Sequence, residues 1–534
     1  MSDADALASV LPGSFHLVVS AGGQTRFQGS ITGLRRVFHS RISGVVVAGD
    51  RADVLAAMSG DGIDERMLAV TVACGGHVPP PLGEQPMWSG VSSLPADHAL
   101  VWDGQRARAM RWWRPPAPDK PLAQGAGEVR EALSCALRQR APAQGRLSAD
   151  LSGGMDSTSL CFLAARDVPG LLTVRWAEAE AGNDDAVFAQ HAIAALRDAE
   201  HVVIAQADLP LNFDDPGVLA DAEEPYRYAR TASRTRHTAA VLARGGCRRH
   251  LAGHGGDELF TPLPGYLHRL ARQHPLTALS HLRAHAALRR WPLLPTLARL
   301  ARPGTPADWW QAQADQLTNP PPPPRRPVLG WGMWPLRAPS WVTPQAADLA
   351  RQALQETAHD ARPLADDPGQ HQHLLALRSS TAGYRLLARQ YQQAGVELDM
   401  PYFDDRVAEA VLSVRLHEHA GPLRYKPLLS DAMTGILPDP IRSRTTKGVF
   451  SQDSTTGLRR NLGKIMDLFA DSVLEQAGLI DTDQLRRRLQ QAQRDIRTAI
   501  ALESLIGCET WLRAARNRPT PAPARRLDDP APAP

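Results

Sequence analysis

The chain has 534 residues and a mass of 58.0 kDa, which exceeds one compact hydrophobic core and predicts two or three domains. Lys and Arg total 60 against 56 Asp and Glu, and the net charge of +4 is not gathered in a basic tract, so nucleic acid is not an implied partner. No basic segment followed by an apolar run opens the chain, and no stretch reaches about 18 uninterrupted apolar residues. We therefore expect a soluble, cytoplasmic protein with no membrane partner.

The cysteines follow no metal-binding or disulfide pattern. They form no CxxC pair and no even framework, which favours neither a zinc site nor disulfide bonds and fits a reducing compartment. The five residues are Cys74, Cys135, Cys161, Cys247 and Cys508.

The segment 15–114 predicts a sheet-rich domain. Short β-type runs such as FHLVVS at 15–20, GVVVAG at 44–49 and HALVWDG at 98–104 are each bounded by turn residues. The run WWRPPAPDKP at 112–121 is typical of a linker.

From Gly125 onward, predicted strands alternate with helices. The sequence GEVREALSCALRQRA has apolar residues at helical spacing, and RLSADLSGG leads into a helix from Asp156. The strands LLTVRWAEA, HVVIAQA and RRHLAGHGG follow, and Asn183 or Asp184 would cap the helix DDAVFAQHAIAALRDA. Such alternation predicts a parallel sheet covered by helices.

The rest of the chain is expected to be mostly helical. Its proline run NPPPPPRRP at 319–327 predicts a surface loop. The tail 518–534 has too little apolar content to offset the entropy of ordering it, so we expect it to be disordered.

The strongest chemical signal is the sequence SGGMDS, which begins at Ser152 where an apolar strand ends and a helix begins. Gly153 and Gly154 let the backbone approach a ligand closely, and the helix start directs unpaired N–H groups at a phosphate. Ser152 and Ser157 add hydroxyl donors. Asp156 would repel a bare phosphate but suits a Mg²⁺ that bridges phosphate oxygens. An ordinary glycine-rich turn would not need these residues, and the pattern is not GxxxxGK[ST].

This loop resembles the phosphate loop of the PP-loop ATP pyrophosphatases, and a second segment narrows the resemblance to the asparagine-synthetase-like amidotransferases. Residues 251–266 read LAGHGGDELFTPLPGY, similar to the family's apolar strand, glycine-rich turn and Asp-Glu pair. The resemblance implies that Asp257 is a Mg²⁺ ligand beside Asp156, that Gly255 and Gly256 belong to the nucleotide site, and that ATP and Mg²⁺ are the cofactors. Standing alone, GHGGDE would also fit a flexible turn before a helix.

Three further segments extend the resemblance. The sequence GVELDMPYFDD resembles a family segment in which a glutamate at the reacting centre precedes a Pro-aromatic turn, which implies a catalytic Glu397. Lys426 in RYKPLL resembles a lysine of the following helix, and RTTKGVF resembles the family's Arg-x-x-Lys-x-x-Phe loop, with Arg444 and Lys447. The resemblance implies that Lys447 contacts the α-phosphate and the developing charge. A lone Lys or Arg would otherwise be a solvated surface charge.

The histidines are interpreted without a chemical role. His254 occupies a position that varies in such loops, and we expect it to be a turn residue. His371 and His373 are two residues apart and would not share a helix face, so they predict no metal site.

The chain departs from glutamine-using members of this family at its start. Those members begin with a cysteine exposed by removal of the initiator Met, whereas here MSDA precedes a first strand-like run near Phe15. Ser2 would lie on a polar extension, and the internal Cys74 cannot replace a nucleophile activated by its own α-amine. We therefore expect no ammonia-releasing site.

The expected fold class is α/β with three parts. A degenerate β-rich, glutaminase-like sandwich of the Ntn type would occupy 1–120. An ATP-dependent ligase domain with a parallel sheet and a helical C-terminal part would occupy 121–517, followed by the disordered tail 518–534.

A ligase of this kind without a glutaminase must take its amine from elsewhere, as β-lactam synthetases and lasso peptide macrolactam synthetases do. The sequence LVWDGQRARAMRWWRP resembles the linker strand of lasso peptide cyclases, and the helical part carries a Pro-rich insertion. The preferred interpretation is therefore a cyclase that adenylates an Asp or Glu side chain of a ribosomal precursor peptide and joins it to the peptide's N-terminal amine, with Glu397 helping to remove its proton.

This interpretation implies a precursor peptide as substrate, and a leader peptidase and a leader-binding protein as partners. Three alternatives stay open. They are a β-lactam-synthetase-like small-molecule cyclase, an ammonia-dependent asparagine synthetase, and a pseudo-enzyme scaffold that keeps the fold for binding.

Overall fold

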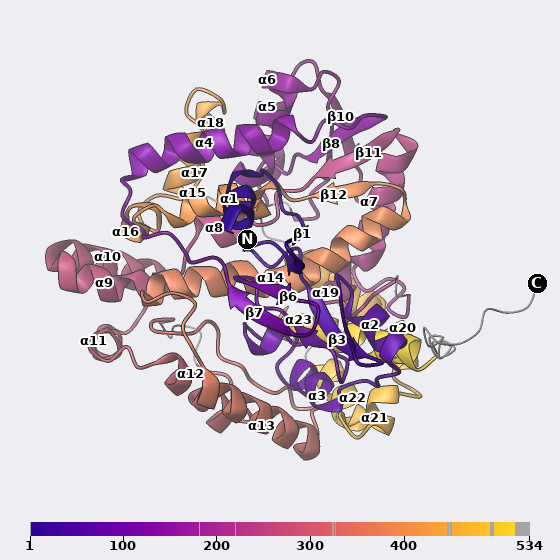
Figure 1. Cartoon of the computed structure of the whole chain (residues 1–534). Coiled ribbons are helices and arrows are strands. Elements are labelled where there is room, and N and C mark those ends of the chain that lie inside the picture. The colour runs from indigo at the N-terminus through magenta and orange to yellow at the C-terminus, as the bar shows by residue number, and fades with distance from the viewer. Residues whose placement is uncertain are drawn as a thin grey trace, which may run out of the picture.

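The structure, a computed structural model, describes residues 2–517 apart from 181, 219–220, 323–324, 326, 446–447, 449–450 and 492–495 (Figure 1). The expected disordered tail 518–534 and the candidate Lys447 lie outside the described residues.

The first part of the chain is sheet-rich, as its short β-type runs predict, and it builds two antiparallel sheets. One sheet has the strand order β1-β2-β6-β7 and the other has the order β4-β3-β5. Gly22 and Gly23, both with positive φ, form the tight turn between β1 and β2, because hairpin turns that match the strand twist need that conformation. The strands are β1 Leu17–Ala21, β2 Gln24–Gln28, β3 Phe38–Ile42, β4 Val45–Gly49, β5 Ser92–Ser93, β6 His98–Trp102 and β7 Ala107–Arg111.

Short helices accompany these sheets, and the first of them precedes β1. They are α1 Ser2–Val10, α2 Ala52–Ser59, α3 Glu65–Ala73 and the 3₁₀ turn η1 Leu82–Glu84. Helix α1 packs against a helix of the later part, α15 Asp405–Leu412.

The second part contains the predicted parallel sheet, with the strand order β10-β9-β8-β11-β12. All four strand pairings are parallel. The strands are β8 Arg146–Asp150, β9 Leu172–Trp176, β10 Glu200–Ile204, β11 Cys247–Leu251 and β12 Glu397–Asp399. The chain enters at β8, moves outward through β9 and β10, and then returns to the other side of β8 as β11. The strand order therefore reverses between β8 and β11.

Helices cover this sheet. Figure 1 shows α4 on one side of the strands and α7 with α14 on the other, and α4 contacts α5 while α7 contacts α14. The side chain of Asn183 accepts a hydrogen bond from the backbone N–H of Asp185, the first residue of α6, at 2.9 Å. Of the two residues predicted to cap this helix, Asn183 is therefore the one whose side chain does so. These helices are α4 Leu122–Arg138, α5 Met155–Asp167, α6 Asp185–Ala195, η2 Ala229–Thr231, α7 Ala232–Arg244 and α14 Pro368–Gln393.

Beyond Gly265 the described chain is helical apart from β12, as expected. None of the described helices has the length and apolar character needed to cross a bilayer. The remaining helices, from α8 onward, are α8 Gly256–Phe260, η3 Pro264–Tyr266, α9 Leu267–Gln273, α10 Pro275–Arg289, α11 Leu293–Ala301, α12 Pro306–Asp315, α13 Pro344–Asp360, η4 Pro401–Phe403, α16 Leu416–His419, α17 Pro427–Ala432, α18 Asp439–Arg442, α19 Ser451–Arg460, α20 Leu462–Leu468, α21 Val473–Gln476, α22 Thr482–Gln491 and α23 Ile496–Arg516.

The hydrophobic cores do not divide at residue 120. The core of the parallel sheet includes Ile31, Leu34 and Trp113 from the first part of the chain. A second core packs α2 and α3 against α13 and α23. The antiparallel sheets are therefore fixed to the later part by shared apolar packing.

Candidate active site

A cavity lies where the strand order of the parallel sheet reverses. It has a volume of about 570 Å³ and is lined by the loops that follow β8 and β11. Ligands of open α/β sheets bind at the carboxyl ends of the strands at such a reversal, because the two loops diverge there. The sequence motifs SGGMDS and GHGGDE supply these two loops.

The loop after β8 has the shape that its glycines predict. Gly153 has a φ of 81°, and a Cβ there would lie 2.4 Å from the carbonyl oxygen of Asp185, so only glycine fits. The hydroxyls of Ser152 and Ser157 are 2.8 Å apart, and the N–H of Gly154 donates to Ser152 Oγ at 3.3 Å. The loop is thus closed by its own serines at the start of α5.

The loop after β11 packs directly against the first one. A Cβ on Gly253 would lie 2.9 Å from the backbone nitrogen of Ser157, and one on Gly256 would lie 2.4 Å from Asp156 Cγ. Gly255, with a φ of 93°, lies against the ring of Phe403 and the Cβ of Tyr402. These glycines therefore allow the two acidic loops to interlock.

Lys426 joins the two predicted metal ligands. Its ammonium contacts Asp156 Oδ2 and lies 2.7 Å from Asp257 Oδ1, and its side chain is fully buried. Burial alone would lower the pKa of Lys426, but Asp156 and Asp257 more than offset it and raise the pKa above its usual value. Lys426 also has a φ of 45°, a strained backbone conformation of the kind found at functional sites.

The carboxylates of Asp156 and Asp257 fit a Mg²⁺ that arrives with ATP. Both converge on the Lys426 ammonium, so both face one point at the mouth of the two loops. Among the described residues no group of three or more His, Cys, Asp or Glu side chains surrounds a metal position. Mg²⁺ is commonly held by one or two carboxylates together with substrate phosphates, which matches this donor set.

Arg444 holds the first loop against α6. Its guanidinium donates to the carbonyl of Gly153 at 3.0 Å and pairs with Asp184 and Asp185 at 2.5 and 2.7 Å. The guanidinium also lies over the ring of Phe188. The Arg444 expected from the RTTKGVF motif is thus at the cavity, whereas its neighbour Lys447 is outside the described residues.

Aromatic rings form another wall of the cavity. The rings of Tyr228 and Tyr384 stack with centroids 5.7 Å apart. The ring of His254 also stacks on Tyr384, with centroids 4.7 Å apart. The Tyr384 hydroxyl donates to Glu258 at 2.8 Å. Burial lowers the pKa of His254, although Asp150 and Glu258 oppose this, which favours a neutral ring.

These wall residues are not evident from the sequence. Tyr228 and Tyr384 lie in no recognisable motif, and only their packing places them side by side. His254 lies in the turn where it was expected, and its ring also lines the cavity.

Glu397 is not among the residues that line the cavity, whereas the GVELDMPYFDD segment implies a place at the reacting centre. It is the first residue of β12, and its carboxylate pairs with Arg249 at 2.6 Å. Its side chain is 57% exposed, and it does not line the cavity.

His371 and His373 are buried and bind the backbone separately. His371 contacts the N–H of Leu364 and the carbonyl of Trp331, and His373 contacts the carbonyl of Leu259. Burial lowers the pKa of both to about 4, so both rings are neutral.

The cysteine nearest the antiparallel sheets is not placed for catalysis. Cys74 ends α3 and is 6% exposed, and burial raises its pKa to about 12. A thiol must lose its proton to act as a nucleophile, and this environment opposes that loss.

Comparison with protein families gives one match over most of the chain. The asparagine synthase family model matches residues 128–513, which include both acidic loops, Lys426 and Arg444. The sequence gives no significant match to an individual curated protein.

Proposed function

The chain belongs to the asparagine synthase family, whose members are ATP-dependent ligases that form carbon–nitrogen bonds, and we propose that it is a macrolactam synthetase for a ribosomal peptide. In this proposal it adenylates an Asp or Glu side chain of a precursor peptide and joins it to the peptide's N-terminal amine. The observation that carries the ligase chemistry is the convergence of Asp156 and Asp257 on buried Lys426 beside the SGGMDS loop.

The first step is adenylation. The substrate carboxylate attacks the α-phosphorus of ATP, a carbon-bound oxygen forms the new P–O bond, and pyrophosphate leaves. Asp156 and Asp257 would hold a Mg²⁺, which offsets phosphate charge when bound. Lys426 keeps the two carboxylates oriented, and Arg444 fixes the loop through the carbonyl of Gly153.

Lys447 is proposed to offset the charge on the α-phosphate. This role rests on the RTTKGVF motif alone, because the residue lies outside the described part of the chain. A fixed positive charge at that oxygen is worth most in a site that excludes water.

In the second step an amine attacks the acyl-adenylate and AMP leaves. If both reacting groups belong to one folded peptide the attack is intramolecular, which can remove about 7–11 kcal/mol of barrier. The Glu397 carboxylate pairs with Arg249 at 2.6 Å and does not line the cavity. The cavity groups nearest that role are neutral His254 and Tyr384, whose hydroxyl donates to Glu258.

The source of the amine favours a substrate that carries its own. The only cysteine before residue 120 is Cys74, which is buried with a raised pKa, so this part of the chain lacks an exposed thiol to release ammonia from glutamine. A volume of about 570 Å³ bounded by aromatic rings suits a nucleotide together with part of a peptide. A leader peptidase and a leader-binding protein are the proposed partners, since the peptide's N-terminus must be freed and delivered.

The test uses the purified protein with ATP, Mg²⁺ and a precursor peptide that has a free N-terminus and an Asp or Glu several residues along. The peptide should lose the mass of one water, and AMP and pyrophosphate should appear in equal amounts. Acetylation of the N-terminal amine should stop ring formation in the matched control, because that amine forms the new bond.

Other outcomes would select the alternatives. Asparagine formed from aspartate and ammonia would favour an ammonia-dependent synthetase, and ring closure of a small β-amino acid would favour a β-lactam-type cyclase. If the protein releases pyrophosphate from ATP but converts none of these substrates to product, the peptide assignment is contradicted and the ligase chemistry stands.

A further inference from the structure

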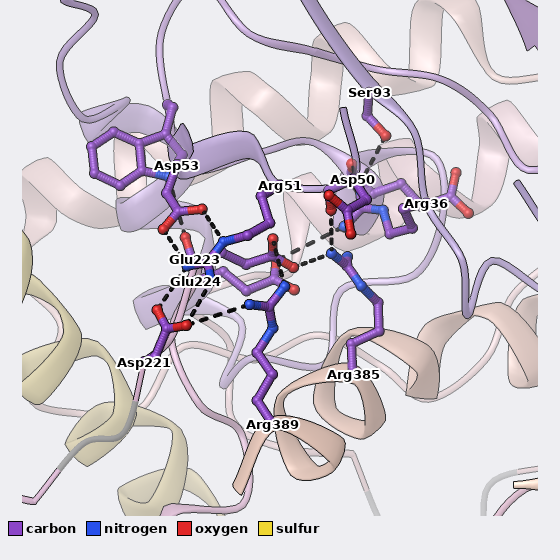
Figure 2. A network of polar contacts seen from close by, with 12 residues as sticks. Arg36, Asp50, Arg51, Asp53, Ser93, Asp221, Glu223, Glu224, Arg385 and Arg389 are labelled. Carbon is purple, nitrogen blue, oxygen red and sulfur yellow. Dashed lines mark hydrogen bonds and ion pairs between the residues drawn. The ribbon is translucent and has the colours of Figure 1, made fainter. Parts of the chain in front are cut away.

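A dense network of charged residues joins the antiparallel sheets to the wall of the cavity (Figure 2). We name the described residues 2–120 the N-terminal part and this cluster the interface network. Its members come from three places: the N-terminal part, the segment 221–224, and one side of α14. They are Arg36, Asp50, Arg51, Asp53, Ser93, Asp221, Glu223, Glu224, Arg385 and Arg389.

Arg51 is the link from the N-terminal part to the segment 221–224. Its guanidinium forms two hydrogen bonds to Asp221, at 2.6 and 2.7 Å, and two to Asp53, at 2.9 and 2.6 Å. Such forked pairs fix direction as well as distance. Figure 2 shows this guanidinium between the two carboxylates.

Glu223 is the buried centre of the network. Only 2% of its surface is exposed; its carboxylate contacts Arg385 and lies 3.7 Å from Arg389. Its carbonyl accepts a hydrogen bond from Trp88 Nε1 at 3.2 Å, and Arg385 also donates to the carbonyl of Asp50 at 3.2 Å. The N-terminal part therefore contacts both the segment 221–224 and α14 at one place.

The segment 221–224 and α14 lead directly to the residues of the aromatic wall. Four residues after Glu224 the chain reaches Tyr228, and the residue before Arg385 is Tyr384. The two rings stack at 5.7 Å, and Gly383 is required there because a Cβ would lie 2.6 Å from the Tyr228 ring. Tyr384 in turn contacts His254 of the second acidic loop. A continuous series of contacts thus runs from Arg51 to the loop that holds Asp257.

We propose that the N-terminal part supports the active-site wall: through the interface network it holds segment 221–228 so that Tyr228 stays stacked on Tyr384. Arg51 is then a positioning residue for the wall, although it does not line the cavity. The naming of a peptide as the substrate rests on the proposed function, whereas the positioning role does not.

Hydrogen exchange tests this role without any substrate. In Arg51→Met, backbone amides of 226–231 should exchange roughly tenfold faster, because the segment loses its forked anchor and opens more often. Arg66→Met is the matched control, since Arg66 is also an arginine of the N-terminal part that pairs with a carboxylate of the later part, Glu356. Exchange in 226–231 should not change in that variant. Unchanged exchange in Arg51→Met, or an equal rise in the control, would overturn the proposal.

Two further variants show whether the effect passes through the network. Asp221→Asn should raise exchange as Arg51→Met does, and the double variant should add little, because both remove the same contact. Fully additive effects would contradict the proposed path. Should Arg51→Met fail to fold, Arg51→Lys keeps the charge without the fork and should show the same rise in exchange.

Kinetics add a readout that a merely structural loss would not give. With the precursor peptide as probe, Arg51→Met should raise the KM for the peptide roughly tenfold while the KM for ATP changes less than about twofold, because the wall and not the phosphate loop is loosened. Equal rises in both values would count against a role at the wall. Absence of turnover in the unmodified protein would contradict the proposed function, and hydrogen exchange would still decide this inference.

Discussion

The buried ammonium of Lys426 lies 2.7 Å from Asp257 Oδ1 and also contacts Asp156, so one cation holds together the two acidic loops of the site. Asp257 is nearly half exposed and Asp156 less so, which leaves both carboxylates open toward the cavity. The arrangement balances the two negative charges before any nucleotide binds. It also makes the loop geometry depend on a residue that is far away in the sequence.

Lys426→Met should therefore destabilise the protein and abolish turnover. Two neighbouring carboxylates lose their shared partner, a loss of about 3 kcal/mol, at the low end for a broken buried pair because Asp257 is partly exposed. Added Mg²⁺ should restore part of the melting temperature, since it supplies the missing charge. Differential scanning fluorimetry with and without Mg²⁺ measures this. Lys464→Met, which removes an exposed pair with Asp214, should change neither quantity; an equal Mg²⁺-dependent recovery there would contradict the prediction.

Asp257→Asn should keep the fold and lower pyrophosphate release at least about a hundredfold, because one of two charged ligands for the nucleotide's metal is lost while Lys426 keeps Asp156. Asp156→Asn should behave alike. The measurement is a coupled pyrophosphate assay over a Mg²⁺ titration. Glu397→Gln is the matched control, and its rate should equal that of the unmodified protein, since its carboxylate pairs with Arg249 and does not line the cavity. A loss of rate in the Glu397→Gln control would instead indicate that Glu397 acts in catalysis.

Gly256→Ala should lower kcat about a hundredfold with little change in melting temperature. The added Cβ would lie 2.4 Å from Asp156 Cγ, so the carboxylate must move by a fraction of an ångström or more from its position beside Lys426. Gly127→Ala, in α4 and with open space around it, should leave the rate unchanged and raise stability slightly. Normal turnover of Gly256→Ala would show that the close contact of the two loops is not needed for catalysis.

The thiol of Cys74 should resist alkylation at pH 8 in the folded protein. Burial raises its pKa to about 12, above the value of about 8.5 for an unfolded cysteine. The folded state thus holds this proton more tightly, and the resulting stability is fully present below about pH 8.5 and is lost as the pH rises toward 12. Mass spectrometry after iodoacetamide should find Cys135, which is partly exposed, modified well before Cys74. Rapid labelling of Cys74 would reopen it as a nucleophile.

Local sequence determined the sheets, the loops and much of the phosphate site. Short β-type runs bounded by turn residues specify strands, helical spacing specifies the covering helices, and SGGMDS with GHGGDE specifies two glycine-rich loops after parallel strands. The α/β class and the membership of the asparagine synthase family follow from the same signals. These features depend on residues that are neighbours along the chain, so their physical causes can be read there.

Tertiary structure alone decided which side chains meet. Lys426 lies 270 residues beyond Asp156, and nothing in RYKPLL distinguishes a buried bridge from a surface lysine. Glu397 stands in a segment that resembles a catalytic one, yet its carboxylate pairs with Arg249 and does not line the cavity. The interface network joins positions 51, 221 and 385. In the sequence, its arginines do not differ from arginines that are solvated at a protein surface. Charge pairing acts over a few ångströms of space, so its partners were fixed only when the sheets packed together.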